Sequence, residues 1–257
     1  MFSTDLVVLC LACFTAGFVD SIVGGGGLIQ LPALIMCLPG HALLTVLGTN
    51  KMISITGNSI SAYRFSKHIP FIFKIIFPTA VAAFIFSVFG AWVVSIVSNE
   101  ILKPVFMVLL FVIFLITLKN KNFGLIDHQE IKVVPVWKLL TIGALIGFYD
   151  GFFGPGTGSL LIIAFVGILN MTFVQGSAYA KIINFVTNIA AISFFIFKGA
   201  FLIDYVIPLM FFNMAGAFLG VRFALLRGNV FVRGLLRVVI FFTILKLGFD
   251  VLKQYLI

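Results

Sequence analysis

The sequence predicts an all-α polytopic membrane protein built from two inverted repeats, each with five apolar segments and a Gly-rich broken helical hairpin. Its composition, a motif that recurs at a fixed shift and short apolar segments beside glycine clusters support this prediction. Hydrophobic residues make up 62% of the chain and charged residues 10%, whereas soluble domains carry about 25% charged residues. Lipid is therefore the expected solvent of most of the chain.

A shift of 130 residues aligns the chain with itself, starting from Asp20 and Asp150. Residues that are rare inside membranes or that shape helices fall into register over about seventy positions, which indicates an internal duplication. We therefore expect residues 1–125 and 126–257 to be two membrane repeats of one transport domain. The matched pairs include Gly17 with Gly147, Gly24 with Gly154, Gly26 with Gly156, Lys51 with Lys181, Asn58 with Asn188 and Pro78 with Pro208.

Each half divides into a series of apolar segments of unequal length. The second segment has eleven residues and covers only about 16 Å, against about 30 Å of hydrocarbon in a bilayer. We interpret it as the returning arm of a hairpin whose tip is the glycine cluster before it. In the first half the segments are 6–23, 28–38, 43–63, 71–97 and 101–118, and the series begins again at Val136.

Basic residues gather in three connections between apolar segments, and they predict the topology. The positive-inside rule places all three clusters in the cytoplasm, with both termini outside it. The halves then have opposite orientations, as in many secondary transporters, whose binding sites lie at broken helices near the midplane. Because the charges follow no single polar face, nucleic acid is excluded as a partner. The clusters are Arg64, Lys67 and Lys74; Lys119, Lys121, Lys132 and Lys138; and Arg222, Arg227, Arg233 and Arg237.

The two hairpins read GFVDSIVGGGGLIQLP (17–32) and GFYDGFFGPGTGSLL (147–161). Their tips open backbone amides that lipid cannot satisfy, so the tips must be buried in protein or line a polar cavity. Free N–H groups at the start of each short arm favour an anion, while close helix packing is the alternative explanation for the glycines. The predicted substrate-binding residues here are Gly24, Gly25, Gly26, Gly27, Gly154, Gly156, Thr157 and Gly158.

Lys51 and Lys181 lie near the middle of the third segment of each half, where an ammonium group is costly. Each could pair with the aspartate of its own hairpin, Asp20 or Asp150, or contact the substrate directly, and a buried pair could also couple transport to protons. Polar side chains share the faces of both lysines, with interhelical hydrogen bonding as the alternative role. The predicted substrate-binding residues on these helices are Thr49, Asn50, Lys51, Asn58, Lys181, Asn184 and Asn188.

The stretches GFVDSIVGGGG, LGTNK, GFYDGFFGPGTGS and AKIINFVTNIAA resemble the sulfite exporter TauE/SafE family of membrane permeases, over nearly the whole chain. The second hairpin resembles the bacterial inner-membrane branch of that family. The resemblance implies a secondary transporter, not an enzyme, that moves sulfite, a sulfonate or another sulfur-containing organic anion. The expected partners are a small anionic solute and the lipid bilayer, a homodimer is left open, and neither a cofactor nor a metal is expected.

Two other functions remain as alternatives. Tyr149 and Asp150 form a YD pair and Asp20 supplies a second carboxylate, as in an intramembrane aspartyl protease. The first aspartate, however, stands in GFVD rather than in the GxGD motif of such proteases, and short motifs match by chance. A scaffold without transport activity would leave the two midplane lysines unexplained.

Overall fold

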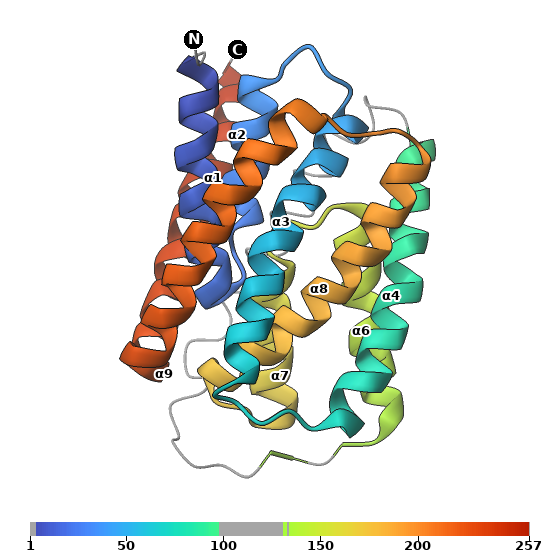
Figure 1. Ribbon diagram of the computed structural model, residues 1–257, viewed down its shortest axis with the longest axis vertical. Helices are drawn as coiled ribbons and strands as arrows, with labels where there is room; N and C mark the ends of the chain where they lie inside the picture. The colour runs from blue at the N-terminus through green and yellow to red at the C-terminus, as the bar shows by residue number, and fades with distance from the viewer. Residues whose placement is uncertain (1–3, 98–130, 133, 257) are drawn as a thin grey trace.

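The computed structural model describes residues 4–97, 131–132 and 134–256, and the regular structure there is α-helical (Figure 1). The predicted all-α class is confirmed. The fifth predicted segment, 101–118, lies outside the described residues. In chain order the helices are α1 (Thr4–Val23), α2 (Gly27–Cys37), α3 (Leu43–Ser66), α4 (Phe73–Ile96), α6 (Val136–Phe152), α7 (Thr157–Leu169), α8 (Phe173–Phe197) and α9 (Ile203–Leu256).

Helix lengths agree with a membrane location. Among the described residues, α1, α4, α8 and the first part of α9 (Ile203–Leu235) are long and apolar enough to cross a bilayer. With 24 residues α3 is also long enough, but it carries buried Asn50, Lys51 and Asn58 and is less apolar. The arms α2 and α7 have only 11 and 13 residues, which confirms that each half contains a short arm.

Large apolar side chains cover the outside of the helices, while each short arm buries one of its faces in the protein. Phe73, Leu145 and Phe211 are each more than half exposed, as expected for surfaces that face lipid chains. Leu34 of α2 and Phe165 of α7 are fully buried in two separate apolar clusters. Each short arm is therefore anchored in the protein by one buried face, whereas Met36 near the end of α2 is exposed.

Helix α9 is interrupted at Gly228, whose φ of 66° and ψ of −161° are not helical. The chain reverses there, so the last part of α9 returns to the end of the molecule that holds the N-terminus (Figure 1). This reversal separates the fourth from the fifth apolar segment that the sequence predicts for the second half. A positive φ is readily adopted by glycine because it has no Cβ.

Helices of the two halves are interleaved. Helix α1 packs along α9 and α6 along α4, while α3 and α8 contact each other. A Cβ atom on Gly17 would overlap the backbone of Asn213, and one on Gly147 would overlap that of Ala83. These two contacts are related by the shift of 130 residues. The repeated glycines thus let helices from opposite halves approach closely, as small residues do in membranes.

Helices that the shift of 130 residues aligns in the sequence run in opposite directions in Figure 1. Helices α1 and α3 run from the upper to the lower end of the view, whereas α6 and α8 run from the lower to the upper end. The α3–α4 connection, the start of α6 and the reversal in α9 lie at the lower end. The predicted basic clusters flank these three places in the sequence.

Candidate functional site

The Gly-rich tips of the α1–α2 and α6–α7 hairpins lie against each other. The Ser159 amide donates a hydrogen bond to the Gly24 carbonyl at 3.3 Å, and a Cβ atom on Gly24 would overlap the Gly158 backbone. Gly24 and its repeat mate Gly154 both have positive φ, at 73° and 94°. These matched glycines are therefore required by backbone conformation, and Gly24 also by the close approach of the second hairpin.

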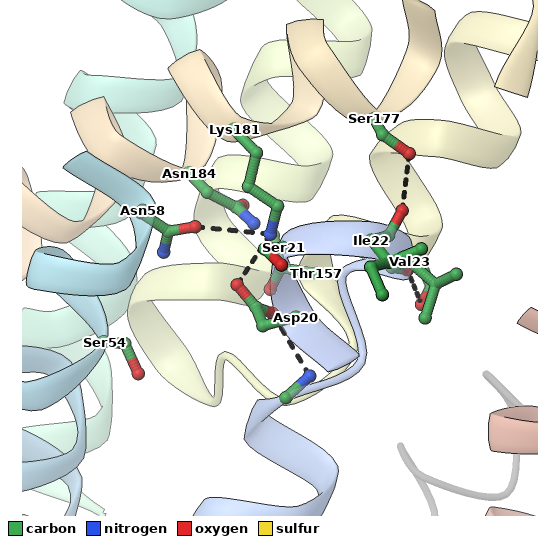
Figure 2. A network of polar contacts seen from close by, with 12 residues as sticks. Asp20, Ser21, Ile22, Val23, Ser54, Asn58, Thr157, Ser177, Lys181 and Asn184 are labelled. Carbon is green, nitrogen blue, oxygen red and sulfur yellow. Dashed lines mark hydrogen bonds and ion pairs between the residues drawn. The ribbon is translucent and has the colours of Figure 1, made fainter. Parts of the chain in front are cut away.

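The second half also satisfies the end of α1. The Ser159 hydroxyl donates to the Val23 carbonyl and the Ser177 hydroxyl to the Ile22 carbonyl, both at 2.7 Å (Figure 2). The last carbonyls of a helix have no partner within it and cannot be left bare in lipid. Two hydroxyls, from α7 and α8, therefore stabilise the end of α1, a role that their positions in the sequence do not predict.

The two midplane lysines form ion pairs that cross between the halves. Lys51 Nζ lies 2.7 Å from Asp150 Oδ2, and Lys181 Nζ lies 2.6 Å from Asp20 Oδ2. Of the alternatives left open by the sequence, pairing of each lysine with the aspartate of its own hairpin is therefore wrong, because each pairs with the aspartate of the other hairpin. The partners are exchanged because each hairpin tip meets the third helix of the other half, as the position of the Lys51 ammonium beside Gly154 shows.

The two pairs differ in burial and in their further contacts. The side chains of Lys51 and Asp150 are each 5% exposed, whereas Lys181 is fully buried and Asp20 is 20% exposed. Asp20 Oδ1 also accepts a hydrogen bond from the amide of Gly26, the residue that caps α2, at 3.1 Å (Figure 2). The positive end of α2 thus already faces a carboxylate of the protein.

Several predicted binding side chains make internal hydrogen bonds. Thr49 donates to the Thr45 carbonyl and accepts from the Leu202 amide, so it holds the connection between α8 and α9. Asn58 accepts a hydrogen bond from the Lys181 ammonium at 3.3 Å. Thr157 donates to the Gly154 carbonyl and closes the turn before α7. These three side chains position the helices and the lysine around the hairpin tips.

A buried amide network lies beside the first hairpin and was missed in the sequence. Gln30, only 1% exposed, donates to Asn50 Oδ1 at 3.0 Å and to Ser54 at 3.3 Å, and accepts from Asn213 at 2.9 Å. Its repeat mate is Leu160, so the shift of 130 residues gave no signal for it. The polarity of Gln30 within an apolar arm was the available clue.

Asn184 and Asn188 are both buried on α8, at 5% and 3% exposure. The Oδ1 atom of Asn184 has no hydrogen-bond partner among the described residues. The remaining predicted residues lie at the hairpin tips: Gly25, Gly26, Gly156 and Gly158 are buried, and Gly27 and Gly154 are partly buried. The structure therefore gathers most of the predicted residues around one junction.

Comparison with known proteins gives matches over nearly the whole chain, both to a family model and to individual relatives. A family model described as Sulfite exporter TauE/SafE matches residues 9–247. A probable membrane transporter protein ORF9 from Sinorhizobium sp is 36% identical over 91% of this chain and 88% of its own length. A probable membrane transporter protein from Haemophilus influenzae is 31% identical over 95% of both chains.

A third relative, the probable membrane transporter protein YfcA of Escherichia coli K12, is 32% identical over 95% of this chain and 90% of its own length. No solved structure matches the chain. All three relatives are named as membrane transporters, and each match covers more than nine tenths of this chain.

Proposed function

Since the chain belongs to the sulfite exporter TauE/SafE family and is a multi-pass membrane transporter, we propose that it is a secondary transporter of a small anion, of the sulfite or sulfonate class, in the bacterial inner membrane. The observation that carries the proposal is the junction of the two hairpin tips. Two lysines, two aspartates and the starts of two short helices lie together there.

Electrostatics favour an anion at this junction. The charges of Lys51 and Lys181 are balanced by those of Asp150 and Asp20. The starts of α2 and α7 each add a partial charge equivalent to about +0.5. The ends of α1 and α6 at the same tips contribute about −0.5 each, so the positive potential is local to the N–H groups at the starts of the short helices, where little water screens it.

An inverted repeat of residues 1–125 and 126–257 is part of the proposal. It is supported by the opposite directions of α1 and α6 in Figure 1 and by contacts that recur at the shift of 130 residues, such as those of Gly17 and Gly147. In transporters of this kind the repeats move against each other around a site at their interface. The crossed ion pairs lie at such an interface and would have to tolerate that motion.

The contacts of the aspartates argue against a protease. Aspartic proteases need two carboxylates close enough to share a proton. Here Asp20 and Asp150 are each neutralised by a lysine instead. A scaffold would have no need for two buried ion pairs, because replacing such pairs by apolar side chains is often neutral or stabilising.

The proposal is tested with the purified protein in liposomes. We expect radiolabelled sulfite or a small sulfonate to be transported, and the same anion to raise the melting temperature in detergent through mass action. Removal of a whole ion pair in Lys51→Met/Asp150→Asn should lower the flux by roughly tenfold or more, because an intramembrane charge is usually functional. Lys198→Met, at an exposed position, is the matched control and should transport normally.

Two results would contradict the proposal. One is a protein that neither moves nor is stabilised by sulfite, sulfonates or small carboxylates. The other is cleavage of a transmembrane peptide that is lost in Asp20→Asn and in Asp150→Asn, which would restore the protease alternative.

A further inference from the structure

We propose that transport is coupled to protons through the Asp20–Lys181 pair: Asp20 takes up a proton when the anion binds and releases it when the anion leaves, whereas the Lys51–Asp150 pair stays ionised. This inference rests on the proposed transport of a small anion and names its coupling ion. It is argued from the different surroundings of two ion pairs that the duplication makes equivalent.

Asp20 is the more accessible of the two aspartates. Its side chain is 20% exposed, against 5% for Asp150. Figure 2 shows the Asp20 carboxylate between Lys181 and the start of α2, with Asn58 and Thr157 nearby, so polar groups of the junction surround it. A carboxylate must reach water to exchange a proton, and Asp20 is the better placed of the two to do so.

A proton on Asp20 would leave the charge of Lys181 uncompensated. Lys181 is fully buried, and its Nζ atom lies 2.6 Å from Asp20 Oδ2, so protonation of the carboxylate turns a neutral pair into one with a net positive charge. An unpaired charge away from water is costly, and an anion beside the ammonium group would restore the balance. The proton and the anion therefore bind together, and each raises the affinity of the protein for the other.

Lys181 also has a second acceptor, which Lys51 lacks. The Lys181 ammonium donates to Asn58 Oδ1 at 3.3 Å, and this hydrogen bond remains when Asp20 is protonated. Within the described residues, the Lys51 ammonium makes no hydrogen bond to a neutral acceptor, and its ion-pair partner is Asp150. Protonation of Asp150 would therefore cost more than protonation of Asp20, so the Lys51–Asp150 pair is expected to stay ionised.

The charge of Asp20 also holds its own hairpin. Asp20 Oδ1 accepts a hydrogen bond from the amide of Gly26, the residue that caps α2, at 3.1 Å. Hydrogen bonds to an ionised carboxylate are roughly twice as strong as those between neutral groups, so a proton on Asp20 loosens the start of α2. The second hairpin is closed by a neutral contact instead, from the Tyr149 hydroxyl to the Pro155 carbonyl. Uptake of a proton by Asp20 is thus linked to the movement of the first hairpin.

Lys181 is the ion-pair partner of Asp20 among the described residues. Helix α7, which contacts α1, carries no titratable side chain. The other titratable groups described on α1 and on the helices packed against it form neither an ion pair nor a hydrogen bond with Asp20 in that part of the chain. They are Asp5, Cys10 and Cys13 of α1; Cys37 of α2; Lys51, Tyr63 and Arg64 of α3; Tyr179 of α8; and Asp204, Tyr205, Arg222, Arg227 and Arg233 of α9.

The test uses methanesulfonate, an anion whose own charge does not change near neutral pH. The concentration that gives half of its melting-temperature shift in detergent is measured at about pH 6 and about pH 8. In the wild type this concentration should rise with pH, by up to roughly tenfold per pH unit, which is the limit for one proton per anion. In Asp20→Asn, whose side chain is neutral at every pH, the two values should agree within about twofold.

Asp150→Asn is the matched control, because it neutralises the repeat mate of Asp20. It should keep the dependence on pH that the wild type shows, whatever its affinity at a single pH. If the wild type binds sulfite but not methanesulfonate, sulfite takes its place. The titration of sulfite itself is the same for every variant, so a difference in pH dependence between Asp20→Asn and Asp150→Asn still comes from the protein.

Two charge-balanced variants replace the single variants if these do not fold. Lys181→Met/Asp20→Asn should give either no shift or a shift that does not depend on pH. Lys51→Met/Asp150→Asn should give a shift that depends on pH as in the wild type. A shift with the wild-type pH dependence in the first variant, or the loss of this dependence in the second, contradicts the inference.

The outcomes separate this inference from the proposed function. Equal binding of methanesulfonate by the wild type at both pH values refutes coupling through Asp20 and leaves anion transport untouched. A pH dependence that survives in Asp20→Asn, or that is lost in Asp150→Asn, does the same. If no small anion stabilises the wild-type protein, anion binding itself is refuted.

Discussion

Lys51 and Lys181 are charged groups that neither water nor lipid solvates, so their free energy depends on the carboxylate that each one meets. Removal of one partner of a buried ion pair typically costs about 3–5 kcal/mol, because an uncompensated charge is left behind. Removal of both partners costs much less. The crossed pairs Lys51–Asp150 and Lys181–Asp20 therefore make a specific prediction about which double variants recover.

We expect Lys51→Met to lose about 3–5 kcal/mol of unfolding free energy, and Lys51→Met/Asp150→Asn to recover most of that loss. Lys51→Met/Asp20→Asn is the matched control. It removes one partner from each pair, so it should be less stable than either single variant. Melting temperatures of the purified variants in one detergent measure the effect. Recovery in the control, rather than in the Asp150→Asn double variant, would mean that the pairs form within each half.

The sequence identified the four charged residues of the junction, but it did not identify their partners. Asp20 and Asp150 are repeat mates, so each offers either lysine the same chemistry at a similar depth. Only the packing of each hairpin tip against the other half decides between them. Gln30 was missed for a different reason, because it has no polar repeat mate and its partner Asn213 lies 183 residues further along the chain.

At the scale of elements, the hairpins illustrate what segment length can predict. An apolar run too short to cross a bilayer, placed after a glycine cluster, is sufficient to predict a returning arm, and α2 and α7 are such arms. The contact between their tips could not be predicted, because it involves backbone atoms of Gly24 and Gly158 rather than a side-chain pattern. The hydroxyls of Ser159 and Ser177 belong to the same contact.

Three glycines allow the hairpin contact to be tested with graded controls. Gly24 combines a positive φ with close contact to Gly158, Gly199 has a positive φ with open space around it, and Gly40 has neither feature. We expect Gly24→Ala to cost about 2–6 kcal/mol, from strain and overlap together. Gly199→Ala should cost about 1–3 kcal/mol from strain alone, and Gly40→Ala should change stability by at most about 0.5 kcal/mol.

Unfolding free energies of the three alanine variants provide the measurement. The order Gly24, Gly199, Gly40 is the expected result. A Gly24→Ala protein as stable as the Gly199→Ala protein would show that the two hairpin tips do not touch as described.

At the scale of the whole molecule, the arrangement of the basic connections leads to a topology prediction. The α3–α4 connection, the start of α6 and the reversal in α9 lie at one end of the molecule, and the start of α1 and the end of α9 at the other (Figure 1). The positive-inside rule assigns the basic end to the cytoplasm. We therefore expect a cysteine placed at Asp127, in a variant without Cys10, Cys13 and Cys37, to resist an impermeant thiol reagent in intact cells.

The same cysteine should react after permeabilisation, and a cysteine placed at Ser3 should react without it. Labelling of the Asp127 position from outside intact cells would reverse the predicted orientation. Asp127 and Ser3 lie outside the described residues, so this prediction rests on the sequence and on the positions of the neighbouring helices.

The crossed pairs also set an order for biosynthesis. Asp20 and Lys181 are separated by 161 residues of chain. At a synthesis rate of 5–20 residues per second, Asp20 is made about 8–30 s before its partner Lys181. Until Asp150 has been made, Asp20 and Lys51 are both present without their final partners, so the newly made first half must keep these charges hydrated or pair them with each other. In the second case maturation includes an exchange of partners, which is completed only when α8 has entered the membrane.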